Sequence, residues 1–420
     1  MIANCNYPAL VRSHGRRMIA LVGICFLGTG GCARTTTSPS KTSALPRSAA
    51  GVPEPLTLEQ LVVSQNTAET LKALHERGLE RLAQRDFISA ESDFNLCVEA
   101  QPKSPLAPSC LYHGGIASDE LRKFERALDR FREVVLRFPD DELASPAGLR
   151  ALRLAAHLER WNVAETQAKW LMERQRTLRP FELILPYGAL AMGAIQRGDD
   201  ATAEQYVARA RSLIEQHELD VPGKIHRDLA VVYFALGEVR RIRAERLRFV
   251  PMPTNFPEVL EARCQLLLDA QSAYSDAMRA YDGHWSTMAG YRVSELYVSL
   301  HAEVMRMVAN HPERDPERRK LLEGAMRLRY AVLTKKAQNM IQHTLTLAER
   351  VGEASEWVTR AKAVQADLAK EAQAEEDAIN QLPYSREALA YALQRITAQG
   401  GHSENTGNPA KGPARNARPQ

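Results

Sequence analysis

The chain of 420 residues has few of the residues that mark several protein classes. Aromatic residues make up only 6% of it, and Gly and Pro occupy 23 and 22 positions. Numbers this low exclude a fibrous or low-complexity chain. A surplus of one charge is also missing, because 55 Lys and Arg are matched by 51 Asp and Glu. Because positive and negative charges are nearly equal in number, the chain has no general electrostatic attraction to nucleic acid.

Recognisable catalytic motifs are missing as well. The sequence contains no zinc-protease helix motif, phosphate loop, dinucleotide fingerprint or nucleophile elbow. Its 11 histidines are scattered. His311 and Asp315 fall in a predicted turn before a helix, and the acidic run 375–377 fits a solvated helix face. We therefore expect no metal, no cofactor and no small-molecule substrate.

The N-terminus combines positive charge, a short apolar run and small residues before a cysteine: Arg12, Arg16, Arg17, residues 18–27, Gly30, Gly31 and Cys32. The run has about ten residues, whereas a transmembrane helix needs ~20. This order resembles the signal peptide and lipobox of bacterial lipoproteins, with Thr29 departing from the usual Leu. The resemblance implies a signal peptide over 1–31 and lipid on Cys32. A plain secretory signal and an uncleaved anchor are the alternatives.

Residues 32–56 are predicted to be a flexible tether. The segment is rich in Thr, Ser, Pro and Ala and cannot bury a core. At ~5–6 Å × √n, its r.m.s. reach is about 27 Å. Ala33, rather than Asp, follows the cysteine, which resembles the outer-membrane default of lipoprotein sorting. We expect an outer-membrane protein that faces the periplasm, with 52 bases and 51 acids left after removal of the signal.

Four weak repeats follow the tether. Alanines recur at steps of 37, 37 and 39 residues, and the first two repeats add a Gly, a Phe and a Pro at fixed distances: Ala90, Ala127, Ala164 and Ala203; Gly78 and Gly115; Phe94 and Phe131; Pro102 and Pro139. The third repeat is degenerate, with Leu152, Ala168 and Arg176 at the Gly, Phe and Pro positions. A generic helical bundle with alanines recurring by chance is the alternative.

This spacing resembles the tetratricopeptide repeat (TPR), which forms two antiparallel helices over about 34 residues. The resemblance implies that Gly78 and Ala90 lie where the two helices cross, with Phe94 beside the crossing. Pro102 would end the second helix, because proline lacks the N–H group that continues it. We therefore predict an all-α, TPR-like helical-hairpin solenoid over residues 57–222.

The C-terminal half, residues 223–399, is predicted to continue as long TPR-like helices. Helical patterns cover 225–250, 258–281, 285–309, 315–352 and 354–381, with a short helix from Pro383 to about 398. Gly352 and the pair Asp282-Gly283 are predicted helix stops. Arginines at 240–248 favour a solvated helix face, with docking on an acidic surface or lipid headgroups as the alternative. Residues 400–420 are predicted to be a disordered tail.

Three cysteines remain after the signal and Cys32. Export would place them in an oxidising compartment, where disulfides form. Cys97 falls on the second helix of one repeat and Cys110 begins the next helix, so the two lie on neighbouring helices. A disulfide between them and burial as two small thiols both stay open. Cys264 has no obvious partner.

Taken together, the lipobox and the repeats resemble TPR lipoproteins of myxobacteria and related bacteria, some of which belong to envelope motility machinery. The resemblance implies a non-catalytic scaffold that binds envelope proteins or peptides. An assembly factor for a secretin, an outer-membrane barrel or cell-wall synthesis is the alternative, and a cell-wall-degrading enzyme is a minor one. The repeat register places eight residues on the partner-binding concave side: His75, Leu79, Tyr112, Ile116, Arg153, His157, Met192 and Gln196.

Overall fold

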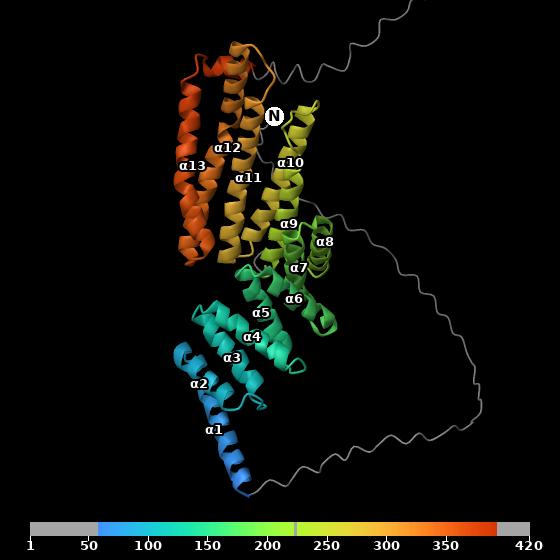
Figure 1. Ribbon diagram of the computed structural model, residues 1–420, viewed down its shortest axis with the longest axis vertical. Helices are drawn as coiled ribbons and strands as arrows, with labels where there is room; N and C mark the ends of the chain where they lie inside the picture. Colours follow the sequence, from blue (N-terminus) through green and yellow to red (C-terminus); the bar gives the residue numbers. More distant parts are fainter. Residues whose placement is uncertain (1–57, 222–224, 393–420) are drawn as a thin grey trace, which may run out of the picture. The chain divides into compact units, whose positions relative to one another are not determined.

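The computed structural model describes residues 58–221 and 225–392, with side chains described from Thr67 onward. The predicted signal peptide, Cys32, the tether and the tail 400–420 lie outside the described residues. Within the described ranges all regular secondary structure is helical, as predicted (Figure 1). In the same ranges, no helix combines the length and the apolar character needed to cross a membrane.

The N-terminal part consists of consecutive helical hairpins: α1 (Leu58–Ala83) with α2 (Phe87–Ala100), α3 (Ala107–Glu120) with α4 (Phe124–Arg137), α5 (Ala144–His157) with α6 (Trp161–Glu173), and α7 (Ile184–Gln196) with α8 (Asp200–Gln216). Short 3₁₀ helices at Gln175–Thr177 and Pro180–Leu183 connect α6 to α7. The second helices α2, α4 and α6 begin 37 residues apart. The repeat period of the sequence is therefore the period of the hairpins.

Close helix crossings explain the Gly and Phe columns of the repeat. A Cβ on Gly78 would lie 2.7 Å from Cε1 of Phe94, and one on Gly115 would lie 2.7 Å from Cε1 of Phe131. Both rings are fully buried. Only glycine allows α1 and α3 to approach the aromatic rings of their partners so closely. The close approach of Gly78 and Phe94 that the resemblance implies is confirmed.

The degenerate third hairpin uses a different pair at the same place. Leu152 of α5 and Ala168 of α6 occupy the glycine and phenylalanine positions, and both are fully buried. The large side chain has moved to the first helix and the small one to the second. An exchange that conserves volume keeps the space filled, which is why the repeat survives without its consensus residues.

The turns inside the hairpins share a left-handed residue that the sequence pattern did not reveal. Arg85, Arg122 and Glu159 have φ angles of 63°, 56° and 54°, and Gly198 has 74°. An L-residue in this region costs roughly 1–2 kcal/mol relative to the right-handed one. Because Arg and Glu stand where glycine is expected, composition did not mark these turns.

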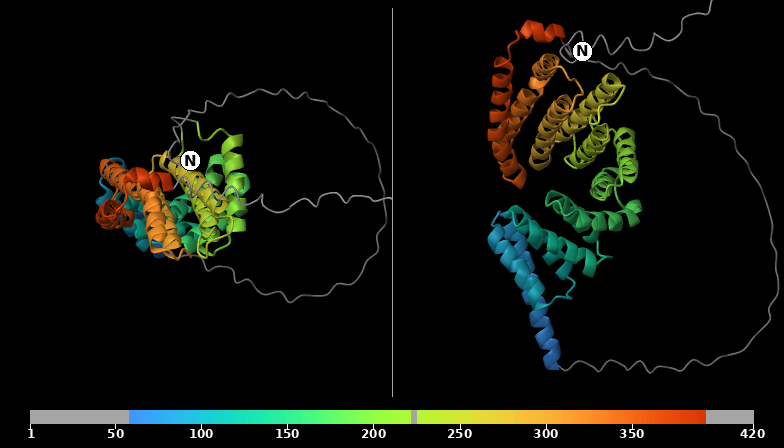
Figure 2. Two further views of the ribbon diagram at one scale, coloured as in Figure 1. Left: turned by 90° about the horizontal axis from the view of Figure 1, so that it is seen from above. Right: turned by 45° about the horizontal axis from the view of Figure 1, so that its top comes forward.

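The C-terminal part comprises α9 (Leu229–Glu245), α10 (Phe256–Met278), α11 (Gly283–Ala309), α12 (Pro316–Val351) and α13 (Glu356–Asn380), which agree closely with the predicted helices. Residues 386–392 form the described part of the predicted last helix. Neighbouring helices of this part pack side by side (Figures 1 and 2). The Gly–aromatic crossing recurs here, since a Cβ on Gly237 would lie 2.5 Å from Cε1 of the buried Tyr274.

One predicted helix stop is confirmed and the other is wrong. Gly352 caps α12 in the left-handed conformation, with φ 68°. Asp282, by contrast, begins a helix, because its carboxylate accepts the backbone N–H of Trp285 at the start of α11. The left-handed residue before that helix is Tyr281, with φ 57°. Asp and Gly occur at both helix ends, so the pair alone did not define the direction.

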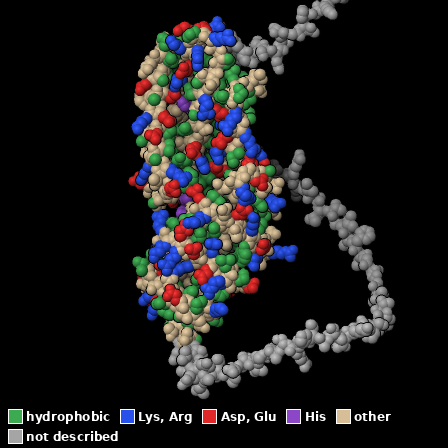
Figure 3. Space-filling view, in the orientation of Figure 1, with side chains coloured by type: hydrophobic (Ala, Val, Ile, Leu, Met, Phe, Trp, Pro, Cys, Tyr) green, Lys and Arg blue, Asp and Glu red, His purple; other side chains and the backbone are tan. Residues whose placement is uncertain are grey.

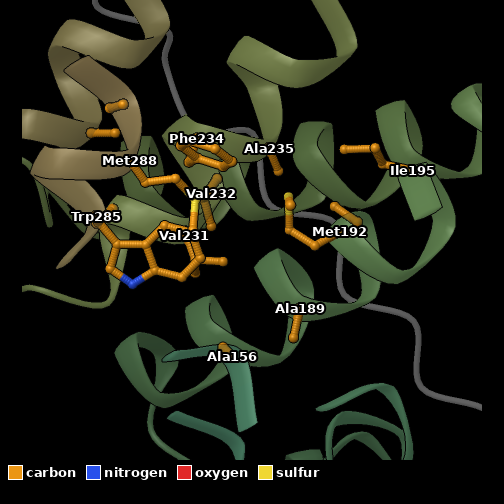
Figure 4. Packing of buried hydrophobic residues seen from close by; sticks show 14 of the residues in the cluster. Ala156, Ala189, Met192, Ile195, Val231, Val232, Phe234, Ala235, Trp285 and Met288 are labelled. Atoms are coloured by element: carbon orange, nitrogen blue, oxygen red, sulfur yellow. The ribbon is translucent and has the colours of Figure 1, made fainter. Parts of the chain in front are cut away.

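A single buried hydrophobic cluster extends from Leu111 in α3 to Trp357 in α13 and includes residues on both sides of the predicted boundary at residue 222. Figure 4 shows its centre, where Trp285 and Met288 of α11 lie near Val231 and Phe234 of α9. The described parts of the segments 57–222 and 223–399, divided in the sequence by weaker repeat consensus, therefore share one hydrophobic core.

The Gly78–Phe94 crossing predicts a specific effect of overpacking. The substitution Gly78→Leu should lower the free energy of unfolding by roughly 1–3 kcal/mol, because Phe94 is buried and cannot move aside. The matched control is Ala73→Leu on the exposed side of α1, which should change it by less than about 0.5 kcal/mol. Urea unfolding followed by circular dichroism measures both. Equal stability of the two variants would contradict the crossing.

Candidate partner-binding surface

Most of the first helices of the hairpins, which we call the A-helices, contact the next one along the chain. α1 contacts α3, and α5, α7, α9, α11 and α13 contact one another in that order. The face of these helices is where the eight predicted binding residues belong. On the side drawn in Figure 3, acidic and basic side chains are interspersed, without a large field of one sign.

At the N-terminal end, a hydroxyl group links α1 to α3. The Ser109 Oγ lies 2.7 Å from Nε2 of His75 and 3.1 Å from Nδ1 of His113. Nδ1 of His113 also lies 2.9 Å from the Ser109 carbonyl oxygen, which can only accept, so this nitrogen carries a hydrogen. Burial lowers the pKa of both histidines, which favours neutral rings. Such neutral hydrogen-bonding groups suit recognition of a polar partner group.

Three further predicted binding residues on α1 and α3 are half-buried. Leu79 packs on the first-hairpin cluster, and Ile116 packs on the main core. The Tyr112 ring lies 5.7 Å from that of Phe131, and its hydroxyl accepts a hydrogen bond from Nε of Arg150 at 3.3 Å. His75, Leu79, Tyr112 and Ile116 thus lie on one partly accessible face of α1 and α3.

The other predicted residues have different environments. Arg153 forms two hydrogen bonds with the Asp228 carboxylate, at 2.9 and 2.7 Å. Its positive charge is therefore paired with an acidic residue of the same chain. Met192 is only 3% exposed and lies in the core between α7 and α9 (Figure 4). Its placement on a binding surface was wrong, because the alanines around it let α9 pack directly over α7. Gln196 is exposed.

His157 belongs to a junction between distant parts of the chain. Its ring lies 4.2 Å from that of His284 at the start of α11. Nearby, Nε1 of Trp357 donates to Oε1 of Glu159 at 2.7 Å, across 198 residues of sequence. The turn after α5 is therefore packed against the beginnings of α11 and α13. This junction ties the middle of the A-helix face to the C-terminal helices.

Beyond the junction, α9, α11 and α13 enclose a cleft with a cavity of about 480 Å³. The lining residues come from three segments far apart in sequence: Arg241 and Glu245; Tyr291, Arg292, Ser294, Glu295, Val298 and Ser299; Val364, Asp367, Leu368 and Glu371. Val298 and Val364 are half-buried and pack on Leu368 and its neighbours. Of the twelve lining residues, four are apolar (Tyr291, Val298, Val364 and Leu368) and six are charged; we call the first set the apolar walls and the second the charged rim.

Two arginines in this cleft are held by acidic residues of the same chain. Arg241 contacts Glu238 and Glu245, each at 2.8 Å. Arg292 contacts Glu238 at 3.1 Å and Glu295 at 2.6 Å. Burial opposes both charges, but the carboxylates outweigh it and raise the pKa of both arginines. The guanidinium groups are therefore fixed cations that stiffen the wall.

The sequence does not reveal this cleft, although the arginines at 240–248 are conspicuous in it. Four of them contact an acidic side chain or a carbonyl oxygen: Arg240 with the Asp269 carbonyl, Arg241 with Glu238 and Glu245, Arg243 with Glu204, and Arg246 with Asp200. These pairs favour the interpretation as an ion-paired helix face over docking on lipid. No local motif marks the cleft, since its walls meet only in the fold.

The cysteine pairing left open by the sequence is a disulfide in the structure. Cys97 and Cys110 are joined between α2 and α3, with their Cα atoms 6.4 Å apart. Cys264 is a free, half-buried thiol. Among the described residues no group of three or more His, Cys, Asp and Glu could hold a metal ion. Asp315 instead caps α12 through the backbone N–H of Glu317.

Comparisons with known proteins bear on the fold alone. No protein-family model matches the sequence, and no curated protein matches it. Solved structures similar to the chain include a tetratricopeptide repeat protein from Parabacteroides merdae ATCC 43184, at 14% identity and a TM-score of 0.35, covering 67% of this chain and 98% of that one. Another is a TPR repeats protein from Bacteroides fragilis NCTC 9343, at 15% identity and a TM-score of 0.25, covering 61% of this chain and 98% of that one. The TPR-like class of this chain rests on its own hairpins and glycine crossings.

The histidine junction predicts a loss of stability in acid. His284 is 4% exposed, and neither ring nitrogen has a hydrogen-bond partner in the described chain. Burial, with a smaller contribution from His157, lowers its pKa to about 3. Because the unfolded histidine takes up a proton near its ordinary pKa of 6.5, stability is lost as the pH falls from there toward 3.

Between pH 7 and pH 5 this loss should be about 2 kcal/mol for His284 alone. The variant His284→Phe keeps an aromatic ring and should lose about that much less than the wild type over the same interval. His343→Phe, at an exposed position on α12, is the control and should follow the wild type. Urea unfolding at both pH values measures the difference. Parallel pH curves for all three proteins would contradict the prediction.

Proposed function

We propose that this protein is an exported lipoprotein that acts as a non-catalytic scaffold and binds envelope proteins through its A-helices. The observation that carries the proposal is the cleft between α9, α11 and α13, with apolar walls and a charged rim. Repeat arrays of this kind present long surfaces suited to peptides or protein partners. The partly accessible face of α1 and α3 adds a second contact region.

The proposed export and lipid anchoring rest on the N-terminal sequence. Arginines, a short apolar run and Gly30-Gly31-Cys32 support cleavage before Cys32 and lipidation of that residue. Anchored in the outer membrane through a tether of about 27 Å r.m.s. length, the helical part would work in the periplasm close to the membrane. A role in a motility or other envelope complex is consistent with this location.

Replacement of Cys32 tests the proposed lipid anchor. The wild-type protein should partition into the detergent phase and carry diacylglycerol on Cys32, detected by mass spectrometry. Cys32→Ser should remain as an uncleaved precursor or become soluble, because the thioether cannot form. Unchanged processing and unchanged membrane extraction of Cys32→Ser would rule out the lipoprotein assignment and leave a plain secretory signal or an uncleaved anchor.

A pair of substitutions on α13 tests the scaffold role. Val364→Asp places a charge on the apolar wall and should weaken capture of an envelope partner at least about tenfold, or ~1.4 kcal/mol. Ala366→Asp, at an exposed position of the same helix, should leave capture unchanged. Cross-linking and affinity capture from solubilised envelope, with matched thermal unfolding, measure both. Capture unaffected by Val364→Asp would exclude the cleft as the interface.

The proteins captured from solubilised envelope, together with an assay on purified cell wall, separate the scaffold role from an assembly factor and from a cell-wall-degrading enzyme. An assembly factor would co-purify with a secretin, an outer-membrane barrel or a cell-wall synthase, and therefore shares the binding mode proposed here. A cell-wall-degrading enzyme would release fragments from purified cell wall, and one carboxylate substitution would abolish that release. Turnover of this kind would overturn the non-catalytic assignment.

A further inference from the structure

We infer that the cleft between α9, α11 and α13 receives a basic segment of a partner protein that carries apolar anchor residues. The inference rests on the proposed scaffold function and deepens it, because it names the chemistry of the partner. It follows from three features of the cleft: its length, its apolar walls and its unequal charges.

The length of the cleft suits a short chain segment. Its lining residues extend from Tyr291 to Ser299 on α11 and from Val364 to Glu371 on α13. At 1.5 Å per residue these spans are about 12 Å and 10 Å. A cavity of about 480 Å³ between them accepts several side chains of an entering segment, but it cannot enclose a folded domain. Peptides recognised in grooves between helices use contacts of this extent.

The walls explain why the segment must carry apolar residues. Tyr291, Val298 and Val364 are half-buried and contact the small buried cluster around Leu368. Covering their exposed part would remove apolar surface from water, which favours association.

The rim explains why the segment must be basic. The lining contains four carboxylates, Glu245, Glu295, Asp367 and Glu371, and only two cations. Both cations, Arg241 and Arg292, are already held by Glu238, Glu245 and Glu295. Asp367 has only an exposed contact with Lys370 at 3.8 Å, which contributes little. The surplus on the α13 side is negative, so Lys and Arg of a partner complement it.

Two other occupants fit less well. The chain's own residues 400–420 include Lys411, Arg415 and Arg418, but no Leu, Ile, Val, Met or aromatic residue that could fill the walls. Anionic lipid headgroups would face a carboxylate rim and be repelled. A basic amphipathic segment from another protein satisfies the walls and the rim together.

A binding experiment with synthetic peptides tests this inference on the full-length protein in neutral detergent. The probe is a labelled 20-residue peptide with Leu at i, i+3, i+4 and i+7 and Lys elsewhere, and its counterpart has Glu in place of Lys. Fluorescence anisotropy is measured at low and at physiological salt. The test variant carries Asp367→Lys and Glu371→Lys, two exposed positions on α13. The control carries Glu99→Lys and Glu349→Lys, which change the net charge equally at exposed positions outside the cleft.

We expect the Lys peptide to bind the wild type, with affinity falling as salt rises, and the Glu peptide to bind at least tenfold more weakly. The cleft variant should lose at least tenfold in affinity for the Lys peptide, and the control should stay within twofold of the wild type. Thermal unfolding confirms that both variants are folded. Equal losses in the two variants, or equal binding of the two peptides, would overturn the inference.

Two further outcomes separate this inference from the proposed function. If the Lys peptide does not bind while Val364→Asp still weakens capture of an envelope partner at least tenfold, the scaffold function stands and the basic partner is wrong. If removal of residues 400–420 raises affinity for the Lys peptide more than tenfold, the tail itself occupies the cleft. That result would also overturn a partner segment as its occupant.

Discussion

The close crossing of paired helices is the constraint on which the rest of the structure depends. In three hairpins a glycine on the first helix lies directly against an aromatic ring of the second: Gly78 with Phe94, Gly115 with Phe131, and Gly237 with Tyr274. A side chain at any of these glycines would meet the ring well inside normal contact distance. Because each hairpin is closed at its crossing, the outer edges of the first helices remain available to contact the next hairpin.

Stacking of these hairpins divides the A-helix face into regions with different roles. In the middle, the Arg153–Asp228 pair, the His157–His284 contact and the Trp357–Glu159 hydrogen bond join elements that are distant in sequence. Polar side chains there are engaged in contacts that hold the fold together. At the C-terminal end, α9, α11 and α13 diverge enough to leave a cleft, and the surplus of negative charge collects on its α13 side.

The tertiary structure also explains why charge composition said little about binding. The numbers of positive and negative charges in the chain are nearly equal, and most arginines of residues 240–248 form ion pairs with nearby acidic side chains. What remains for a partner is a local difference of a few charges at one rim. Such differences are small in the sum over the chain, yet they dominate at short range in a partly desolvated cleft.

The sequence by itself determined the helical class, the 37-residue period and the main helix bounds, because periodic apolar residues, helix-ending Pro102 and Gly352 act over a few residues of chain. It also determined the place of the Gly78–Phe94 crossing, since the spacing is a property of one hairpin. Only the tertiary structure decided that Met192 is core, that Arg153 is paired, and that Arg241, Tyr291 and Leu368 share one cleft. These facts depend on which helices meet across long stretches of chain, and no local pattern encodes the angle at which successive hairpins stack.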